Sequence, residues 1–140
     1  MPANATPSIV KRARRRLREA GQRSTAHRAQ VLAELTAAAR PMSHHELEAR
    51  LAPIDKVTLY RVLDWLVAQG IAHRVAGIDR VWRFAVTAAG HSRHAHFECS
   101  RCSKVVCLGQ PPGRSSLRLP RGYRLERYEL TATGLCARCA

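Results

Sequence analysis

Residue types that bind metal ions are concentrated in one short stretch, residues 91–107, which reads His-Ser-Arg-His-Ala-His-Phe-Glu-Cys-Ser-Arg-Cys-Ser-Lys-Val-Val-Cys. This stretch holds three of the seven histidines and three of the five cysteines of the chain. The other two cysteines, Cys136 and Cys139, lie at the C-terminal end of the chain. Imidazole nitrogens and thiolate sulfurs are common zinc ligands. The pattern therefore predicts a metal centre that residues 91–107 begin and the last residues complete.

Two pairs of cysteines have the spacing of a structural zinc site. Each pair has two residues between its cysteines, which allows both sulfurs to face one tetrahedral ion at about 2.3 Å. The pairs are separated by 33 residues. We predict one closed structural Zn²⁺ per chain, which would reinforce a domain too small for a large core. Its ligands would be Cys99, Cys102, Cys136 and Cys139. Reduced thiols or disulfides are the alternative.

The remaining histidines and the odd cysteine predict a second, regulatory metal site. His94 and His96 are two residues apart, so on a strand both rings would lie on the same face. Cys107 falls on a predicted strand that could pair with theirs, and His91 lies close enough in sequence to reach the same ion. His73 lies on the apolar face of a predicted hairpin, where a histidine is more often a packed core residue. Cys107 could instead be a buried inert thiol or a redox-reactive one.

The charge of the chain predicts a polyanionic partner. The formal net charge is +14 and the sequence pI is about 11.1. Phosphate groups favour such a surface, because approaching cations release counterions from nucleic acid. Five cations lie opposite the apolar stripe of a helix expected over residues 8–20, with Ser8 as its cap and Gly21 after its end. These cations form either a phosphate-binding face or a solvated one. They are Lys11, Arg12, Arg14, Arg15 and Arg18.

Three further helices are expected before residue 71. The second begins at Ser24 or Thr25 and runs to about residue 38, and a short third follows the capping box that starts at Ser43. The fourth has a strong apolar face between Asp55 as its cap and Gly70 at its end. Three residues near its N-terminal end lie off that face, as base-reading groups do in helix-turn-helix proteins. They are Thr58, Tyr60 and Arg61; Tyr60 could alternatively be a packed aromatic residue.

A hairpin over 71–75 and 81–85 completes a winged-helix pattern, since three or four helices precede it. We predict an α+β protein with a winged-helix DNA-binding domain over 1–86, a hinge over 87–93 and a zinc-binding domain over 94–140. The last domain should contain three strands, at about 94–98, 104–108 and 123–130. No apolar run approaches the ~18–20 residues of a membrane helix and no signal peptide is evident. We therefore expect a cytoplasmic protein without a membrane partner.

These features together resemble the ferric uptake regulator family of metal-dependent repressors. The resemblance extends over about residues 8–140. It rests on five stretches: 21–28 (Gly-Gln-Arg-Ser-Thr-Ala-His-Arg), 57–63 (Val-Thr-Leu-Tyr-Arg-Val-Leu), 68–73 (Ala-Gln-Gly-Ile-Ala-His), 94–102 (His-Ala-His-Phe-Glu-Cys-x-x-Cys) and 134–139 (Gly-Leu-Cys-x-x-Cys).

The resemblance implies a homodimer that binds palindromic operator DNA when a regulatory metal at the hinge is bound. It implies a small C-terminal α/β dimerisation domain around the Cys₄ zinc site. By residue, Tyr60 and Arg61 match the DNA-reading pair, and Arg23 matches a basic residue that approaches the minor groove. His94 and His96 match regulatory ligands, and His73 matches a position that zinc-sensing members use.

Several positions depart from the iron-sensing pattern of the family. Pro41 replaces a histidine, and no acidic residue follows the second wing strand, where Phe84-Ala85 stands. Cys107 occupies an acidic ligand position. A second histidine-rich site is eroded, with Arg93, Ala95 and Tyr128 at its ligand positions, and the dimerisation helix region, 109–121, is short and proline-rich. The changed ligand positions remove support for iron or peroxide as the signal, whereas the short 109–121 region bears on the dimer interface.

The sequence therefore predicts a zinc-responsive transcriptional repressor of the zinc uptake regulator type, with no substrate other than metal. The regulatory ion would bind His73, His94, His96 and Cys107, with His91 as a further candidate. The alternatives are a sensor of another metal (iron) or of redox state, and a constitutive basic zinc-ribbon protein that binds nucleic acid. An enzyme is not expected. A zinc deaminase would use His96-x-Glu98, but it needs a proline where Leu135 stands and would leave Cys99 and Cys102 unused.

Overall fold

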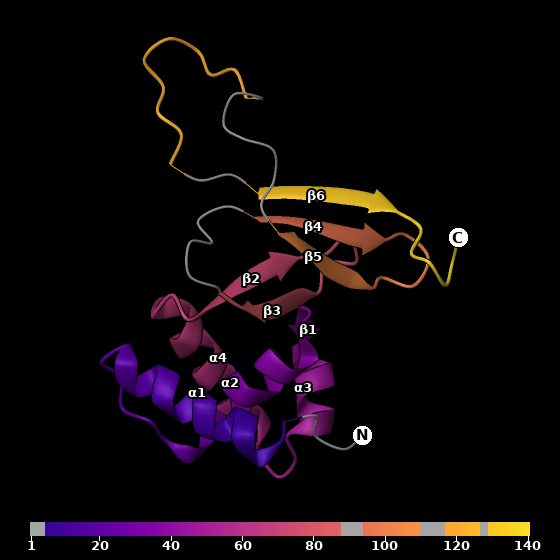
Figure 1. Cartoon of the computed structure of the whole chain (residues 1–140). Helices are drawn as coiled ribbons and strands as arrows, with labels where there is room; N and C mark the ends of the chain where they lie inside the picture. The colour runs from indigo at the N-terminus through magenta and orange to yellow at the C-terminus, as the bar shows by residue number, and fades with distance from the viewer. Residues whose placement is uncertain (1–4, 88–93, 110–116, 127–128) are drawn as a thin grey trace. The chain divides into compact units, whose positions relative to one another are not determined.

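The computed structural model describes residues 5–87, 94–109, 117–126 and 129–140. The chain divides into two compact units, Met1–Thr87 and Ala88–Ala140, and each is described by itself (Figure 1). Apart from Thr87, the predicted hinge over 87–93 lies outside the described residues, as do Arg93, Tyr128 and most of the 109–121 region.

Four helices make up most of the first unit (Figure 1). They are α1 (Pro7–Glu19), α2 (Ala26–Ala38), α3 (His44–Arg50) and α4 (Lys56–Ala68). The sequence predicted all four, but Ser8 is not the cap of the first. The helix α1 begins at Pro7, and Thr6 is its N-cap residue. Proline suits a first helical position, because its fixed φ is already helical and its missing N–H would have no partner there.

The other three helices begin at side-chain caps that the sequence predicted. The Thr25 hydroxyl accepts from the Arg28 amide at 3.3 Å, and an Asp55 carboxylate oxygen accepts from the Thr58 amide at 2.9 Å. The capping box before α3 is complete. The Ser43 hydroxyl accepts from the Glu46 amide at 3.2 Å, while the Glu46 carboxylate accepts from the Ser43 amide at 2.9 Å. Each cap satisfies an amide that the helix leaves without a partner.

The apolar face of α4 lies at the centre of the core of the first unit. Its buried residues are Leu59, Val62, Leu63 and Leu66. They belong to one cluster with Leu17 of α1 and with Leu32 and Leu35 of α2, all nearly or fully buried. This packing fixes the orientation of α4 and leaves its opposite face exposed for contacts outside the unit.

A small antiparallel sheet completes the winged helix. The predicted hairpin is formed by β2 (Ala72–Ala76) and β3 (Trp82–Val86). A third strand, β1 (Met42–Ser43), was not predicted because two residues give no alternation to recognise. The strand order is β1-β3-β2, with Met42 opposite Phe84. Since β1 leads directly into α3, the sheet fixes where that helix starts.

The second unit contains a mixed three-stranded sheet with the order β5-β4-β6. Its strands are β4 (His94–Cys99), β5 (Val105–Gly109) and β6 (Glu129–Gly134). The first two agree with prediction and pair antiparallel, whereas β6 runs parallel to β4.

The predicted strand over 123–130 is wrong in position, because the strand runs from Glu129 to Gly134. Residues 123–126 are not in a strand, and Tyr123 is 70% exposed. In the described part of the chain, the alternating residues there have no partner strand. By contrast, the small Gly134 fits under Phe97, where an added Cβ would lie 3.2 Å from the ring. None of the helices in the described part of the chain is long and apolar enough to cross a membrane.

The caps allow a stability test of this architecture. Ser43→Ala should lower the free energy of unfolding by about 1 kcal/mol, because it removes the oxygen that satisfies the Glu46 amide. Ser8→Ala is the matched control. The Ser8 hydroxyl lies 2.9 Å from the Thr6 hydroxyl on the surface, so its loss should cost less than about 0.5 kcal/mol. Urea unfolding measures both, and equal losses would contradict the assigned caps.

Candidate metal centres and nucleic-acid interface

The four predicted zinc ligands lie together at one end of the second sheet. The sulfur atoms of Cys99, Cys102, Cys136 and Cys139 are all within 4.8 Å of one another. The Sγ atoms of Cys102 and Cys136 are 3.8 Å apart. Four sulfurs at 2.3 Å around a tetrahedral ion would be about 3.8 Å from each other. The donor set and its spacing therefore fit a structural zinc ion.

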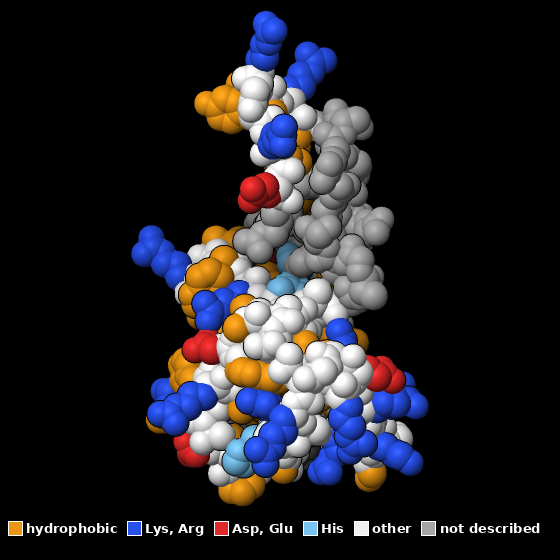
Figure 2. Space-filling model, turned by 90° about the vertical axis from the view of Figure 1, so that its left-hand side faces the viewer, with side chains coloured by type: hydrophobic (Ala, Val, Ile, Leu, Met, Phe, Trp, Pro, Cys, Tyr) orange, Lys and Arg blue, Asp and Glu red, His pale blue; other side chains and the backbone are white. Residues whose placement is uncertain are grey.

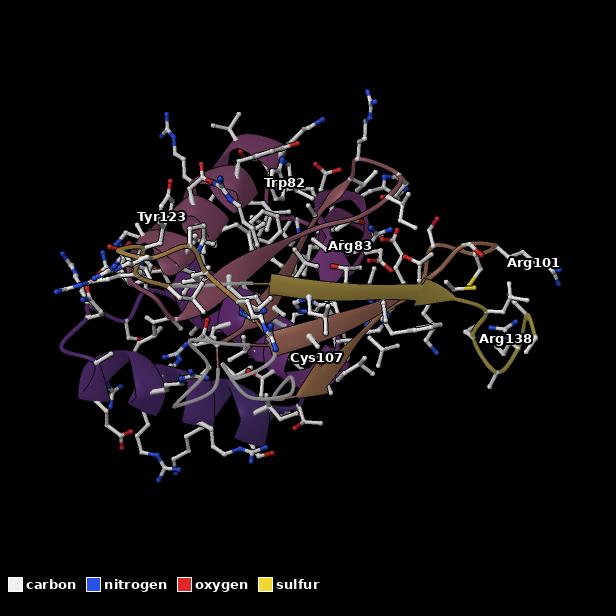
Figure 3. The ribbon with its side chains drawn as sticks, turned by 90° about the horizontal axis from the view of Figure 1, so that it is seen from above. Trp82, Arg83, Arg101, Cys107, Tyr123 and Arg138 are labelled. Carbon is white, nitrogen blue, oxygen red and sulfur yellow. The ribbon has the colours of Figure 1, made fainter. Side chains whose placement is uncertain are left out.

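Backbone contacts between the two cysteine pairs hold this geometry. The parallel pairing of β4 with β6 places Cys99 opposite Gly134. The Ser100 amide donates to the Gly134 carbonyl at 2.8 Å, and the Cys136 amide points at the Cys99 sulfur at 3.4 Å. Arg101 also donates to the Cys139 carbonyl at 2.7 Å. Figure 3 shows sulfur atoms between the loops that carry Arg101 and Arg138.

The cluster favours thiolates unequally. The amides of Cys102 and Cys136 lower the pKa of Cys99 to about 6, and the Arg138 amide is the main cause of a lowered pKa at Cys136. The pKa of Cys139 is raised to about 12, chiefly because its thiol donates to the Cys136 sulfur. Neighbouring thiolates repel one another, so four cannot ionise together without a compensating cation. A divalent ion would supply that charge.

A second pair of potential ligands faces across β4 and β5. His96 lies opposite Cys107 in the antiparallel register. Directly opposed residues point to the same face, with Cβ atoms about 4.5–5.5 Å apart. The His96 side chain is buried and that of Cys107, labelled in Figure 3, is half-buried. The backbone of His94 pairs with Glu129, but its side chain, like all of His91, lies outside the described part.

The fourth predicted regulatory ligand, His73, belongs to the first unit. Its half-buried ring lies on β2, with Nδ1 3.2 Å from the hydroxyl oxygen of Thr87. The Thr87 amide donates to the Ile71 carbonyl at 2.8 Å, and its carbonyl accepts from Arg16. His73 is thus in contact with the last described residue of the first unit.

The N-terminal end of α4 presents a polar, exposed face. Tyr60 is 40% exposed, and Lys56 and Arg61 are exposed beside it. The Thr58 hydroxyl donates to the Asp55 carboxylate at 2.7 Å, which is the main cause of a lowered pKa at Asp55. Thr58 is therefore part of the helix cap, and a base contact from it stays a prediction.

Arg23 lies between α1 and α2, in a segment held by contacts of Arg28. Its carbonyl accepts from Arg28 at 3.0 Å, and the Arg28 guanidinium lies 3.6 Å from the centre of the Trp65 ring. The Arg23 side chain itself is exposed. The five cations predicted on α1 are exposed as well, and Figure 2 shows Lys and Arg side chains projecting from the helical unit. This surface can contact a phosphate backbone.

His44, a neighbour of Tyr60, is not among the site residues predicted from the sequence. The two ring centres are 3.6 Å apart and nearly parallel, at 23°. Burial lowers the pKa of His44, and the nearby cations Arg74 and Lys56 add to this, while Asp64 and Glu48 oppose it. The only sequence signal was the capping box Ser43–Glu46. It placed His44 at the start of a helix but gave no indication of a partner on α4.

Comparison with known proteins assigns the chain to a family. The family model described as "Ferric uptake regulator family" matches residues 19–131, which is most of the chain. No curated protein matches the sequence at a significant level.

Solved structures share the fold over nearly the whole chain. Holo XcZur is 28% identical, with a TM-score of 0.68 over 95% of this chain and 97% of that one. A zinc uptake regulator complexed with zinc and DNA is 23% identical, with a TM-score of 0.69 over 94% and 92% of the two chains. The ferric uptake regulator of Vibrio cholerae is 22% identical, with a TM-score of 0.67 over 88% and 98%.

The four-cysteine cluster leads to a test by ligand removal. Cys136→Ser should abolish tightly held metal and unfold the second unit, because a small metal-tied domain draws its folding free energy from the ion. Cys107→Ser is the control, since its sulfur is outside the cluster, and should keep that metal through dialysis. Metal content per chain and amide hydrogen exchange measure the outcome. Retention of the ion by the Cys136 variant would contradict the assignment.

The lowered pKa of His44 leads to a test by pH. The unfolded chain binds a proton at the ordinary pKa of 6.5, whereas the folded protein binds it only at lower pH. Unfolding is therefore favoured as the pH falls below that value. His44→Phe removes this proton uptake. As the pH falls from about 7 to about 5, the free energy of unfolding of the variant should therefore rise relative to that of the wild type. Urea titrations at several pH values measure it, and parallel pH profiles would refute it.

Proposed function

The chain belongs to the ferric uptake regulator family, and we propose that it is a zinc-responsive transcriptional repressor that binds palindromic operator DNA as a homodimer. Members of this family regulate transcription in response to metal ions. We place the protein in the cytoplasm and assign it no catalytic residue. The observation that carries the zinc assignment is the pairing of His96 with Cys107, separate from the four-cysteine cluster.

DNA binding is assigned to the exposed end of α4 and to the basic surface around it. Tyr60 and Arg61 would read base edges in the major groove, with Thr58 beside them, and Arg23 would approach the minor groove. The exposed cations of α1 would contact phosphates. In a dimer, two α4 helices can enter successive major grooves, which accounts for a palindromic site. A zinc uptake regulator of the same fold has been seen complexed with zinc and DNA.

Two zinc sites with different tasks are proposed for each chain. Cys99, Cys102, Cys136 and Cys139 would hold a permanent structural ion. His73, His94, His96 and Cys107 would hold the regulatory ion, with His91 as a further candidate. A ligand set of imidazoles and a thiolate binds zinc better than a set of carboxylates, which are harder ligands, would bind it. The 28% identity with holo XcZur supports the zinc-responsive type.

The switch is assigned to the segment between the two units. His73 lies against Thr87 at the end of the first unit, and His96 and Cys107 lie on the second sheet. We propose 87–93 as the hinge between domains over 1–86 and 94–140. Bound zinc would supply one centre that ligands from both domains share. Binding then favours the arrangement in which those ligands converge, and DNA affinity rises if only that arrangement fits the operator.

The test uses a duplex that the zinc-loaded protein selects from a random-sequence pool. Affinity for it should rise at least tenfold with added Zn²⁺ and fall on mild chelation, a shift typical of allosteric coupling. Cys107→Ser and His73→Ala should lose this response yet keep the structural metal and the fold. Fluorescence anisotropy against zinc concentration measures the response.

Other outcomes would identify the alternative functions. A response to Fe²⁺ but not to Zn²⁺ would make the protein an iron sensor, and a response to thiol oxidation at Cys107 would make it a redox sensor. Equal DNA affinity with and without regulatory metal, in wild type and variants, would identify a constitutive nucleic-acid binder.

A further inference from the structure

A ring-on-ring contact joins α3 to the exposed end of α4. The His44 imidazole stacks on the Tyr60 phenol with centres 3.6 Å apart and an interplanar angle of 23°. The same imidazole also contacts the Phe84 ring edge-on, with ring centres 4.9 Å apart and an interplanar angle of 75°. Phe84 is only 1% exposed. The three rings therefore run from the core of the wing sheet to a surface residue of α4.

The backbone on either side of His44 is fixed, so its ring has a defined direction. Met42 pairs with Phe84 across β1 and β3. Ser43 then closes the capping box with Glu46. His44 follows as the first residue of α3, between a strand contact and a helix cap. The wing sheet and α3 thus fix the position at which the imidazole stacks on Tyr60.

Tyr60 lies beside a hollow that would otherwise leave room for its ring to move. The hollow has a volume of about 330 Å³. It is lined by His44, His45, Glu48, Lys56, Tyr60, Val81 and Trp82. Trp82, labelled in Figure 3, is 54% exposed at its rim. Removal of the imidazole would enlarge this space and leave Tyr60 without its stacking partner.

The imidazole behaves as an uncharged ring in this place. Its Nε2 atom is buried and has no hydrogen-bond partner among the described residues. Burial lowers its pKa, which keeps it neutral near pH 7. A phenylalanine ring could therefore replace it without breaking a bond at Nε2.

We propose that His44 is a positioning residue for sequence recognition, which holds the Tyr60 ring in the orientation that reads DNA. This rests on the proposed function of Tyr60. An ordered side chain loses less conformational entropy on binding than a mobile one. His44 therefore strengthens binding to the specific site, with no contact of its own to DNA.

The test combines His44→Ala, His44→Phe, Tyr60→Ala and the double variant His44→Ala/Tyr60→Ala. The duplexes are the zinc-selected one and a scrambled one of the same composition. His44→Ala should weaken binding to the selected duplex about three- to tenfold, the range expected for one aromatic pair. Binding to the scrambled duplex should not change. His44→Phe should restore specific binding, and His44→Ala should add nothing in the Tyr60→Ala background.

A measurement without DNA separates this proposal from the proposed function. In the DNA-free protein, His44→Ala should shift the Tyr60 ring resonances in NMR spectra, whereas His45→Ala, which removes an exposed neighbour, should not. If Tyr60→Ala leaves specific binding intact, the assigned reading role fails and the proposal fails with it. If Tyr60→Ala weakens binding but His44→Ala does not, or His44→Ala weakens it equally without Tyr60, only the positioning role is overturned.

Discussion

Repulsion among four closely spaced sulfurs is the constraint on which the second unit depends. In its described part the buried side chains are Ala95, His96, Glu98, Cys99 and Val105. Three of these five, His96, Glu98 and Cys99, are ionisable, so little apolar burial is available to hold the sheet. Each thiolate that forms opposes the next, and the hydrogen bond from the Cys139 thiol to the Cys136 sulfur is the main cause of the raised pKa of Cys139. A cation at the cluster would turn this repulsion into attraction and tie the residues after β6 to the end of β4.

The first unit has a different source of stability. A continuous apolar cluster joins α1, α2, α3, α4 and the sheet, so no ion is needed to form it. The core fixes α4 along its buried side. On the other side, the Arg74–Asp64 ion pair and the His44–Tyr60 stack connect α4 to β2 and α3. The ion pair is exposed and contributes little to stability, whereas the stack extends to buried Phe84. The orientation of the exposed end of α4 therefore depends more on the His44–Tyr60 stack than on the Arg74–Asp64 ion pair.

Features with a local cause could be predicted from the sequence. The caps at Thr25, Ser43 and Asp55 and the cysteine pairs depend on residues a few positions apart, and the structure has them as expected. Features decided by distant residues could not. Strand β1 exists because Met42 meets Phe84, and β6 is set by β4 rather than by the alternation at Tyr123. The partner of His44 lies sixteen positions along the chain, a spacing that no periodic pattern marks. Three predicted site residues, Arg23, Tyr60 and Arg61, are exposed, which is compatible with their assigned roles.

The two metal assignments are linked through a single strand. Cys99 lies at the end of β4, and His96 lies three residues before it. Because side chains alternate along a strand, a slip of one residue would turn His96 away from Cys107. The Cys99–Gly134 pairing and the contacts of the cysteine cluster resist such a slip. An irregularity between Ala95 and His96 already interrupts the pairing with β5, so the register near His96 depends on the cysteine end of the strand. A permanent ion at the cluster would therefore be a precondition for a responsive site at His96 and Cys107.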